Sequence, residues 1–574
     1  MKTKNYNITS LFLILLVVLA SGCSDYFEPE IDKNRTEEQI WSIPDYAEGI
    51  LMAAYKEIPD MYNTYGGDFL DCATDNATSN RYGASVDKLR AGGWSSNYNP
   101  LDVWGAAFNQ IRNINLFIEN GLDITYVDYN KEIDSAKKAR LKGEAFFLRA
   151  WYQWQLLQNH AGPDEQGAVL GYPILTRVYT QDEEVKLARN TYAECVQQIL
   201  NDCDTAAAYL PLEYMEGDEI PEEINDNQIG RATATAALAL KSRAALYAAS
   251  PLFANNEPDK WATAAQLAKA AIDVIGALPS IDAKFYNDEN SPELIMRKYG
   301  LNRSLENANF PVVLFGQGRT NPSQNLVDAF PMANGYPISD DLNSGYDESM
   351  PYEGRDPRFY RTILFHGAIF KDSTIDMSTT GLNSEMASPE RASRTGYFLR
   401  KWMSPDVNLE VGNAKSDNHY FALFRKVELY LNYAEAANEA WGPDADPLGL
   451  GLTAKDAINA VRNRAGIGST AYADNVASDG VDAFRSLVHN ERRIELCFEN
   501  HRFYDLRRWN SSLEQLNTTI KGVKVERIVS DVDTTFQLTP IDVENYQYGQ
   551  HMFYGPIPFS EVIKSGEIVQ NKGW

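Results

Sequence analysis

Two carboxylates at helical spacing are the clearest candidates for acid–base chemistry in this sequence. Glu435 and Glu439 lie four residues apart in a segment with helical periodicity, so both side chains belong to one face of a helix. Glycoside hydrolysis needs two carboxyl groups about 5 to 9.5 Å apart across a cleft. Acidic residues on a helix face are more often solvated or paired with a neighbouring cation. The sequence carries no P-loop, HExxH or GxSxG motif, so common nucleotide, zinc and serine-hydrolase sites lack their signatures.

A second group of chemically active residue types occupies residues 491–508. Its members are Glu491, Arg492, Arg493, Glu495, Glu499, Arg502, Asp505, Arg507 and Arg508. Acidic and basic side chains at helical spacing indicate an ion-pair lattice. We expect His501, which lies within this lattice, to be structural.

A single cysteine, Cys23, ends an apolar run near the start of the chain. Lys2 and Lys4 precede the run, which extends over residues 11–20. This pattern is typical of a secretory signal peptide and is too short to span a bilayer. The residues 19–23, Leu-Ala-Ser-Gly-Cys, resemble the lipobox of bacterial lipoproteins. We therefore expect residues 1–22 to be a lipoprotein signal peptide, and Cys23 to carry the lipid anchor. The alternative is an ordinary signal peptide with a chance cysteine.

The composition narrows the class of partner. The chain has 574 residues, a hydrophobic content of 44% and a net charge of −26. The hydrophobic content is that of a globular protein. The negative charge argues against nucleic acid as a partner, and against polyanionic polymers unless a local basic patch overrides the field.

The remaining cysteines are Cys72, Cys195, Cys203 and Cys497. Cys195 and Cys203 are eight positions apart in a helical pattern, which separates them by about 12 Å, too far for a disulfide. No CxxC motif is present. We expect buried free thiols, with neither zinc nor disulfides.

The periodic segments that must position these residues are nearly all helical. They cover residues 191–211, 231–254, 261–279, 424–443, 452–466 and 484–509. Capping residues support two helix starts, at Thr191 and Thr453. Irregular stretches rich in Gly, Asn, Pro and Tyr lie at 60–103, 299–360 and 372–420, and loops of such length commonly carry function. The sequence predicts a mostly all-α fold of tetratricopeptide-like stacked helix pairs with long irregular, loop-rich insertions.

Several segments together resemble one family, the SusD/RagB-like outer-membrane lipoproteins that bind glycans for uptake. They are GEAFFLRAWYQWQLL with Arg149, GRATATAALALKSRAALYAASPLF, PSQNLVDAFPMANGYPI, GRDPRFYRTIL, VRNRAGIG, NERRIELCFENHRFYDLRRWN and the final YGPIPFSEVIKSGEIVQNKGW. The resemblance covers nearly the whole chain, and it departs at Lys572, where the family is expected to have Pro. It implies a single domain over residues 23–574, with helical pairs at about 36–290 and 420–515 and the irregular insertion at about 291–420.

The resemblance also implies a function. Such a protein is a non-catalytic cell-surface lipoprotein of a Gram-negative bacterium. It binds an oligo- or polysaccharide and passes it to a SusC-like TonB-dependent transporter in the outer membrane. Asp25, Glu28 and Glu30 look similar to the signal that directs such lipoproteins to the extracellular side. No cofactor is expected, although loop carboxylates and carbonyls can hold Ca²⁺ without a linear motif. A surface glycoside hydrolase and a peptide-binding lid of the same fold stay open as alternatives.

In the family the glycan meets an early loop and a loop after the middle helices. Aromatic planes beside amides, carboxylates or arginines suit sugar rings. In residues 73–100 the candidates are Trp94, Tyr82, Tyr98, Asp75, Asn76, Asn80, Asn97 and Arg81, and in residues 297–310 they are Tyr299, Arg303 and Phe310. We expect Trp94, between Gly-Gly and Ser-Ser, to be exposed and to bind. The alternative for any of these aromatics is that it packs onto helices, which we expect for Trp104, at the head of an apolar run.

Overall fold

The structure is a computed structural model that describes residues 37–62, 65–180, 183, 187–214, 225, 228–254, 257–280, 285–384, 386–530 and 534–574. Cys23 and the acidic residues that follow it lie outside this part of the chain, so the lipid anchor stays a prediction. Within the described residues, no helix is both long enough and apolar enough to cross a bilayer.

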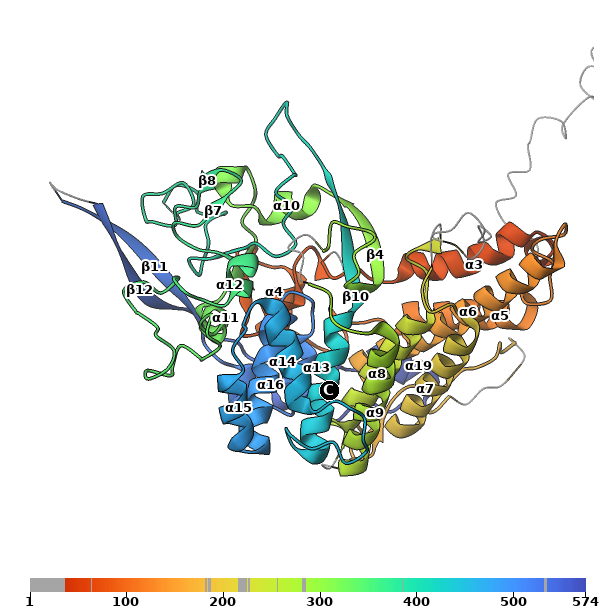
Figure 1. Cartoon of the computed structure of the whole chain (residues 1–574). Coiled ribbons are helices and arrows are strands. Elements are labelled where there is room, and N and C mark those ends of the chain that lie inside the picture. The colour runs from red at the N-terminus through yellow and green to blue at the C-terminus, as the bar shows by residue number, and fades with distance from the viewer. Residues whose placement is uncertain are drawn as a thin grey trace, which may run out of the picture.

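The predicted mostly helical fold is confirmed. The long helices are α3 (Pro44–Glu57), α5 (Trp104–Asn120), α6 (Lys131–His160), α7 (Tyr192–Tyr209), α8 (Ala234–Ala249), α9 (Pro258–Ile275), α13 (Lys426–Trp441), α14 (Ala454–Ala465) and α16 (Val481–Glu495). Neighbours in this series pack on one another, and α13 links α9 to α14 and α16. They form a row from the right to the centre of Figure 1. The helices are therefore stacked in sequence order, as predicted.

Local sequence explains where two of these helices begin and how they pack. Thr191 and Thr453 each accept a hydrogen bond from the third residue of the following helix, and both form the expected capping box. Arg149 on α6 holds Asp202 on α7 through two hydrogen bonds of 2.8 and 2.7 Å. Small alanine side chains fill the buried faces of α8, which lets its neighbours approach closely.

The shorter elements connect and flank this row. The short helices are α2 (Glu37–Ser42), α4 (Ser85–Arg90), α10 (Ser304–Asn309), α11 (Gln324–Ala329), α12 (Pro357–Thr362), α15 (Ala471–Ser478), α17 (Arg502–Arg508), α18 (Leu513–Leu516), α19 (Phe559–Ser565), η2 (Leu70–Ala73), η4 (Val312–Leu314) and η5 (Gln550–Phe553). The strands pair antiparallel as β1 (Ala77–Ser79) with β5 (Thr320–Pro322), β2 (Gly162–Pro163) with β3 (Val169–Leu170), β4 (Leu294–Asn302) with β10 (Asp417–Arg425), β6 (Ile363–Leu364) with β9 (Phe398–Leu399), β7 (Ile369–Phe370) with β8 (Ser373–Thr374), and β11 (Ile520–Val529) with β12 (Thr534–Glu544). The hairpin β11–β12 projects from the body in Figure 1.

The long helix predicted over residues 484–509 is interrupted. Helix α16 ends at Glu495, α17 begins at Arg502, and Phe498 and Asn500 between them have φ of 59° and 62°. The Phe498 N–H donates to Asp71 at 2.9 Å, and Asn500 accepts from the Leu70 N–H at 2.9 Å. These contacts with η2 offset the strain of the left-handed backbone, so tertiary structure overrides the helical pattern.

The protein contains two hydrophobic cores. One fills the space between the stacked helices, and the other lies beneath the irregular residues and gathers aromatic side chains from both halves of the chain. The β1–β5 pair joins the early irregular segment to the insertion. The early segment predicted to meet a ligand is thus held beside residues 320–322, although the two lie far apart in sequence.

Candidate functional site

The expected exposure of Trp94 is wrong. Its side chain is 4% exposed, and its ring lies 5.0 Å from that of Trp574 and 6.3 Å from that of Phe503. Its indole N–H donates to the side-chain oxygen of Asn99 at 2.8 Å. Residues from far along the chain cover the ring, so Trp94 packs in the second core and presents no face to a ligand.

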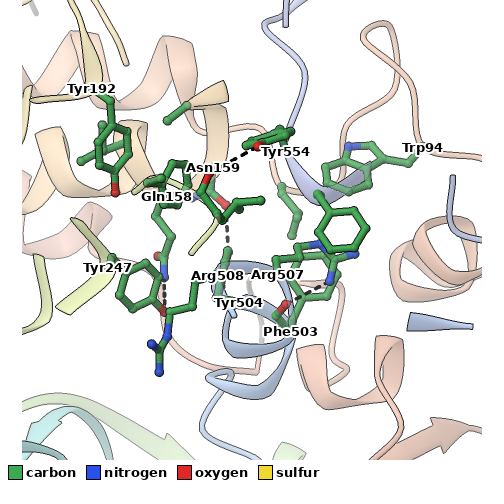
Figure 2. A pocket seen from close by; sticks show the side chains of 17 residues that line it. Trp94, Gln158, Asn159, Tyr192, Tyr247, Phe503, Tyr504, Arg507, Arg508 and Tyr554 are labelled. Carbon is green, nitrogen blue, oxygen red and sulfur yellow. Dashed lines mark hydrogen bonds between the residues drawn. The ribbon is translucent and has the colours of Figure 1, made fainter. Parts of the chain in front are cut away.

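Trp94 also borders a small internal cavity, shown in Figure 2. Tyr504, Arg507 and Tyr554 surround the space with side chains from α17 and the C-terminal segment, and the cavity volume is about 30 Å³. That volume holds about two water molecules. Ligand pockets commonly measure about 300–1,000 Å³. The cavity is therefore too small for a sugar.

Asp75 and Asn76 are also held inside the protein, contrary to the expectation that they face a ligand. Arg502 binds the Asp75 carboxylate through two hydrogen bonds of 2.9 Å, and Arg493 lies at 3.0 Å. Burial alone would raise the pKa of Asp75, but the two arginines outweigh it and lower the pKa. Asn76 is fully buried, and it donates to Asp71 and accepts from Arg493. These residues fasten the early segment to α16 and α17.

The early segment does present two aromatic planes to solvent. Tyr82 is 78% exposed, and the guanidinium of Arg394 lies 5.2 Å from its ring centre. Tyr98 is 39% exposed and is backed by the ammonium of Lys88 at 3.9 Å. Arg81 and Asn97, beside these tyrosines, are exposed as well. These four predicted residues are therefore accessible, and whether they bind a ligand stays a prediction.

The second predicted segment, residues 297–310, consists largely of strand β4 and helix α10 rather than a loop. Tyr299 is 58% exposed and faces Tyr420 across the β4–β10 pair, with ring centres 5.5 Å apart. Arg303 is exposed. Phe310 is 1% exposed and packs on Phe370, so its expected role at the surface is wrong. The reason is that α10 turns this residue into the second core.

Phe315, an exposed aromatic five residues later, was not predicted from the sequence. Its side chain is 57% exposed, and its φ is 67° at the end of η4. A bulky residue in the left-handed region is strained, and such strain is often found at functional sites. The succession Pro311-Val-Val-Leu-Phe-Gly316 marks a turn, but it gives no sign that the phenylalanine points outward.

Several contacts hold the loop of Phe315 beside the early segment. The Asn80 side-chain amide donates to the carbonyls of Gln317 and Gly318 at 3.0 and 2.9 Å. The backbone N–H of Asn80 donates to the carbonyl of Arg319 at 3.0 Å. Pairing of β1 with β5 continues the connection. We call the exposed residues Arg81, Tyr82 and Phe315 the aromatic ledge. They combine flat apolar surface with a cation on segments fixed to one another.

The acid–base candidates are committed to ion pairs. Glu435 accepts from Arg508 at 2.5 and 2.7 Å and from the Trp509 indole at 2.7 Å, while Glu439 binds Arg485 through two bonds of 2.6 Å. Burial would raise the pKa of Glu435, but Arg508 lowers it to about 2. A carboxylate held in this way cannot serve as a proton donor near neutral pH.

The predicted ion-pair lattice is confirmed. Arg425 contacts Glu293, Glu495 and Glu499 at 2.8 to 3.0 Å, and Lys401 adds a bond of 2.6 Å to Glu499. These side chains are buried. Burial raises the pKa of Glu499, but Arg425 and Lys401 outweigh it and lower the pKa. The lattice is structural, as expected for buried charges that are paired.

Two further features bear on cofactors. Cys72, Cys195, Cys203 and Cys497 are buried free thiols, as predicted. Across the part of the chain that the structure describes, no group of three or more His, Cys, Asp or Glu side chains could hold a metal ion.

Comparison with known families adds evidence from nearly the whole chain. Residues 292–574 match the model of the SusD family. Residues 25–246 match a SusD-like model described as starch-binding associating with outer membrane. A SusD-like protein of Formosa agariphila, P38, is 23% identical over 562 residues, which cover 92% of this chain and 96% of that relative.

Solved structures show the same fold. A SusD-like protein from Bacteroides fragilis is similar with a TM-score of 0.73 and 25% identity, over 95% of this chain and 100% of the other. A SusD-like carbohydrate-binding protein from the same organism has a TM-score of 0.66 and 22% identity, over 91% and 98% of the two chains. A laminarin-binding SusD-like protein has a TM-score of 0.58 and 20% identity, over 93% and 100%.

Proposed function

The chain belongs to the SusD-like family of carbohydrate-binding proteins, and from this membership we propose that it captures an oligo- or polysaccharide at the cell surface without cleaving it. The bound glycan then passes to a SusC-like TonB-dependent transporter in the outer membrane. Lipid at Cys23 anchors the chain on the extracellular side. The observation that carries the proposal is the aromatic ledge: Tyr82 lies on the early segment where the family resemblance places the glycan, and Phe315 follows the second such segment by five residues.

Sugar rings have flat C–H faces, and an aromatic plane supplies contact area at low entropic cost. Tyr82 and Phe315 offer such planes, and Arg81 can orient hydroxyl groups. Tyr98, Asn97, Tyr299 and Arg303 extend the accessible surface. The Glu435–Glu439 pair does not support the hydrolase alternative, because both carboxylates hold arginines.

Affinity electrophoresis in gels that contain laminarin or starch tests this proposal. We expect the wild type to be retarded, with no release of reducing ends on prolonged incubation. Losing one stacking plane weakens binding by about 1–3 kcal/mol, by analogy with stacking on bases, or roughly 5- to 150-fold. Tyr82→Ala should show this loss, whereas Tyr129→Ala, which removes a comparably exposed tyrosine (77%) outside the predicted segments, should not.

Three results would oppose the proposal. Release of reducing ends would support the hydrolase. Binding of peptides but of no glycan, measured by calorimetry, would support the peptide-binding lid. Normal retardation of Tyr82→Ala and of Phe315→Ala would remove the aromatic ledge from the site. The delivery step is tested separately by purification from native membranes in mild detergent, where the transporter should co-purify.

A further inference from the structure

A larger pocket lies apart from the aromatic ledge, where the end of α9 meets β4 and the start of α13. Its cavity volume is about 470 Å³, and its lining includes Tyr214, Arg231, Asn290, Arg297 and Lys426. That volume falls within the range of small-molecule sites. Figure 1 shows β4 and β10 between the helix row and the irregular insertion. Arg297 and Lys426 stand on β4 and α13, while Tyr214, Arg231 and Asn290 come from connecting segments.

Arg297 gives the pocket an unusual chemistry. One terminal nitrogen donates to the Leu294 carbonyl at 3.1 Å, while Nε and the other terminal nitrogen are buried without a hydrogen-bond partner. Leaving buried donors unpaired is costly, and the cost is larger for a charged group. Asp288 and Glu289 lie near enough to influence Arg297, but neither forms an ion pair with it among the described residues. Two of the three guanidinium nitrogens therefore lack an acceptor.

A second cation points to the same kind of ligand. The ammonium of Lys426 makes no hydrogen bond or ion pair with any residue that the structure describes, although its backbone N–H donates to Glu293. Arg231 in the lining is already neutralised by Glu48 and Glu144 at 2.7 and 3.0 Å. Neither Arg297 nor Lys426 is paired with a carboxylate among the described residues, although Glu213 also belongs to the lining, in a chain whose net charge is −26.

The strand connects this pocket to an exposed aromatic. Side chains alternate along a strand, so Arg297 and Tyr299 share one face of β4 and are about 6.6 Å apart along it. Their partners across the pair, Ala422 and Tyr420, lie on that face too. Tyr420 donates to Glu289 at 3.2 Å, which keeps that carboxylate beside the tyrosines. A sugar stacked on Tyr299 would therefore have the cationic pocket next to it.

We propose that the pocket around Arg297 and Lys426 binds an oxyanion carried by a sugar residue, either the carboxylate of a uronic acid or a sulfate ester. The inference rests on the proposed function and extends its ligands to glycans that carry acidic groups. Guanidinium and ammonium groups both form charge-assisted hydrogen bonds with such oxyanions. These two cations attract a negatively charged polymer locally, whereas the acidic surface elsewhere repels it.

Isothermal titration calorimetry of the folded chain with three probes tests the inference. The probes are an oligogalacturonide, a sulfated carrageenan oligosaccharide and a neutral laminari-oligosaccharide. We expect one or both acidic probes to bind, and Arg297→Met to weaken that binding roughly 10- to 150-fold, the effect of one charge-assisted bond. Which acidic probe binds distinguishes carboxylate from sulfate.

Lys415→Met is the matched control, since it removes one exposed positive charge elsewhere. It should leave the affinity for the acidic probes unchanged. Arg297→Met should leave the affinity for the neutral probe unchanged. If Arg297→Met does not fold, as judged by circular dichroism, Lys426→Met provides the same test. Added salt should weaken acidic binding, because the attraction is electrostatic.

Other results overturn the inference in distinguishable ways. If the neutral probe binds and neither acidic probe does, the inference fails while the proposed function stands. The inference also fails, and the proposed function stands, if the acidic probes bind the wild type and both variants with equal affinity. If none of the three probes binds, nor any glycan in the gel assay, both fail.

Discussion

Replacing Trp94 with alanine should destabilise the protein without acting directly on ligand binding. The ring is 4% exposed and contacts Trp574 and Phe503. Truncation of a buried tryptophan to alanine typically costs about 3–5 kcal/mol of unfolding free energy. The lost hydrogen bond adds little, because Asn99 still accepts from the Leu101 N–H at 2.9 Å.

Urea denaturation of the wild type, Trp94→Ala and Trp94→Phe measures this effect. Trp94→Phe keeps most of the packing and should cost about 1 kcal/mol. Tyr82→Ala is the exposed control and should stay within about 0.5 kcal/mol of the wild type. At low temperature, where folded Trp94→Ala still dominates, its affinity for a retained glycan should be normal. A Trp94→Ala protein that is as stable as the wild type but no longer binds would refute this reasoning, since the ring would then be reachable.

Three further perturbations test other parts of the structure. The pKa of Glu435 falls from 4.5 to about 2 on folding, so above pH 4.5 its ionised form contributes about 3 kcal/mol more to stability than its protonated form, and this contribution is lost as pH falls toward 2. Urea titrations should show a flatter acid dependence for Glu435→Gln, and an unchanged slope would contradict this. Phe315→Gly should weaken glycan retention roughly 5- to 150-fold. Its free energy of unfolding should equal that of the wild type or exceed it by about 1 kcal/mol, because glycine tolerates φ of 67°. Lower stability with normal retention would count against this prediction. The Cys23→Ala protein should no longer be found in the membrane fraction. If protease added to intact cells still digests it as it digests the wild type, lipid anchoring at Cys23 is disproved.

Local patterns in the sequence predicted the structure correctly where the contacting residues are close in sequence. Helix starts at Thr191 and Thr453 follow from capping residues within one turn. Trp104 is buried as expected, because it contacts Phe108 four residues along the same helix. The apolar spacing contains the information needed for such contacts.

Side-chain exposure in the irregular segments could not be predicted from such local patterns. Trp94 looks exposed between small residues, but the rings that cover it belong to Phe503 and Trp574. Phe310 is buried while Phe315, five residues later, is exposed with a φ of 67°, and no neighbouring side chain reveals that backbone conformation. Exposure of Tyr82 and Tyr299 was correctly expected, because each lies in a polar stretch whose neighbours are exposed or partly exposed.

The arrangement of the second core has a consequence for synthesis on the ribosome. The hydroxyl of Tyr546 donates to the carbonyls of Cys72 and Ala77 at 3.1 and 2.8 Å, and that of Tyr548 donates to Ala73 at 2.7 Å. Because a chain emerges from its N-terminus, the early segment is made long before these partners exist. The helix row can assemble meanwhile from contacts between neighbours. We therefore expect a nascent chain in which α5 to α9 resist protease while residues 65–100 are still cleaved, until the segment beyond residue 545 has been translated.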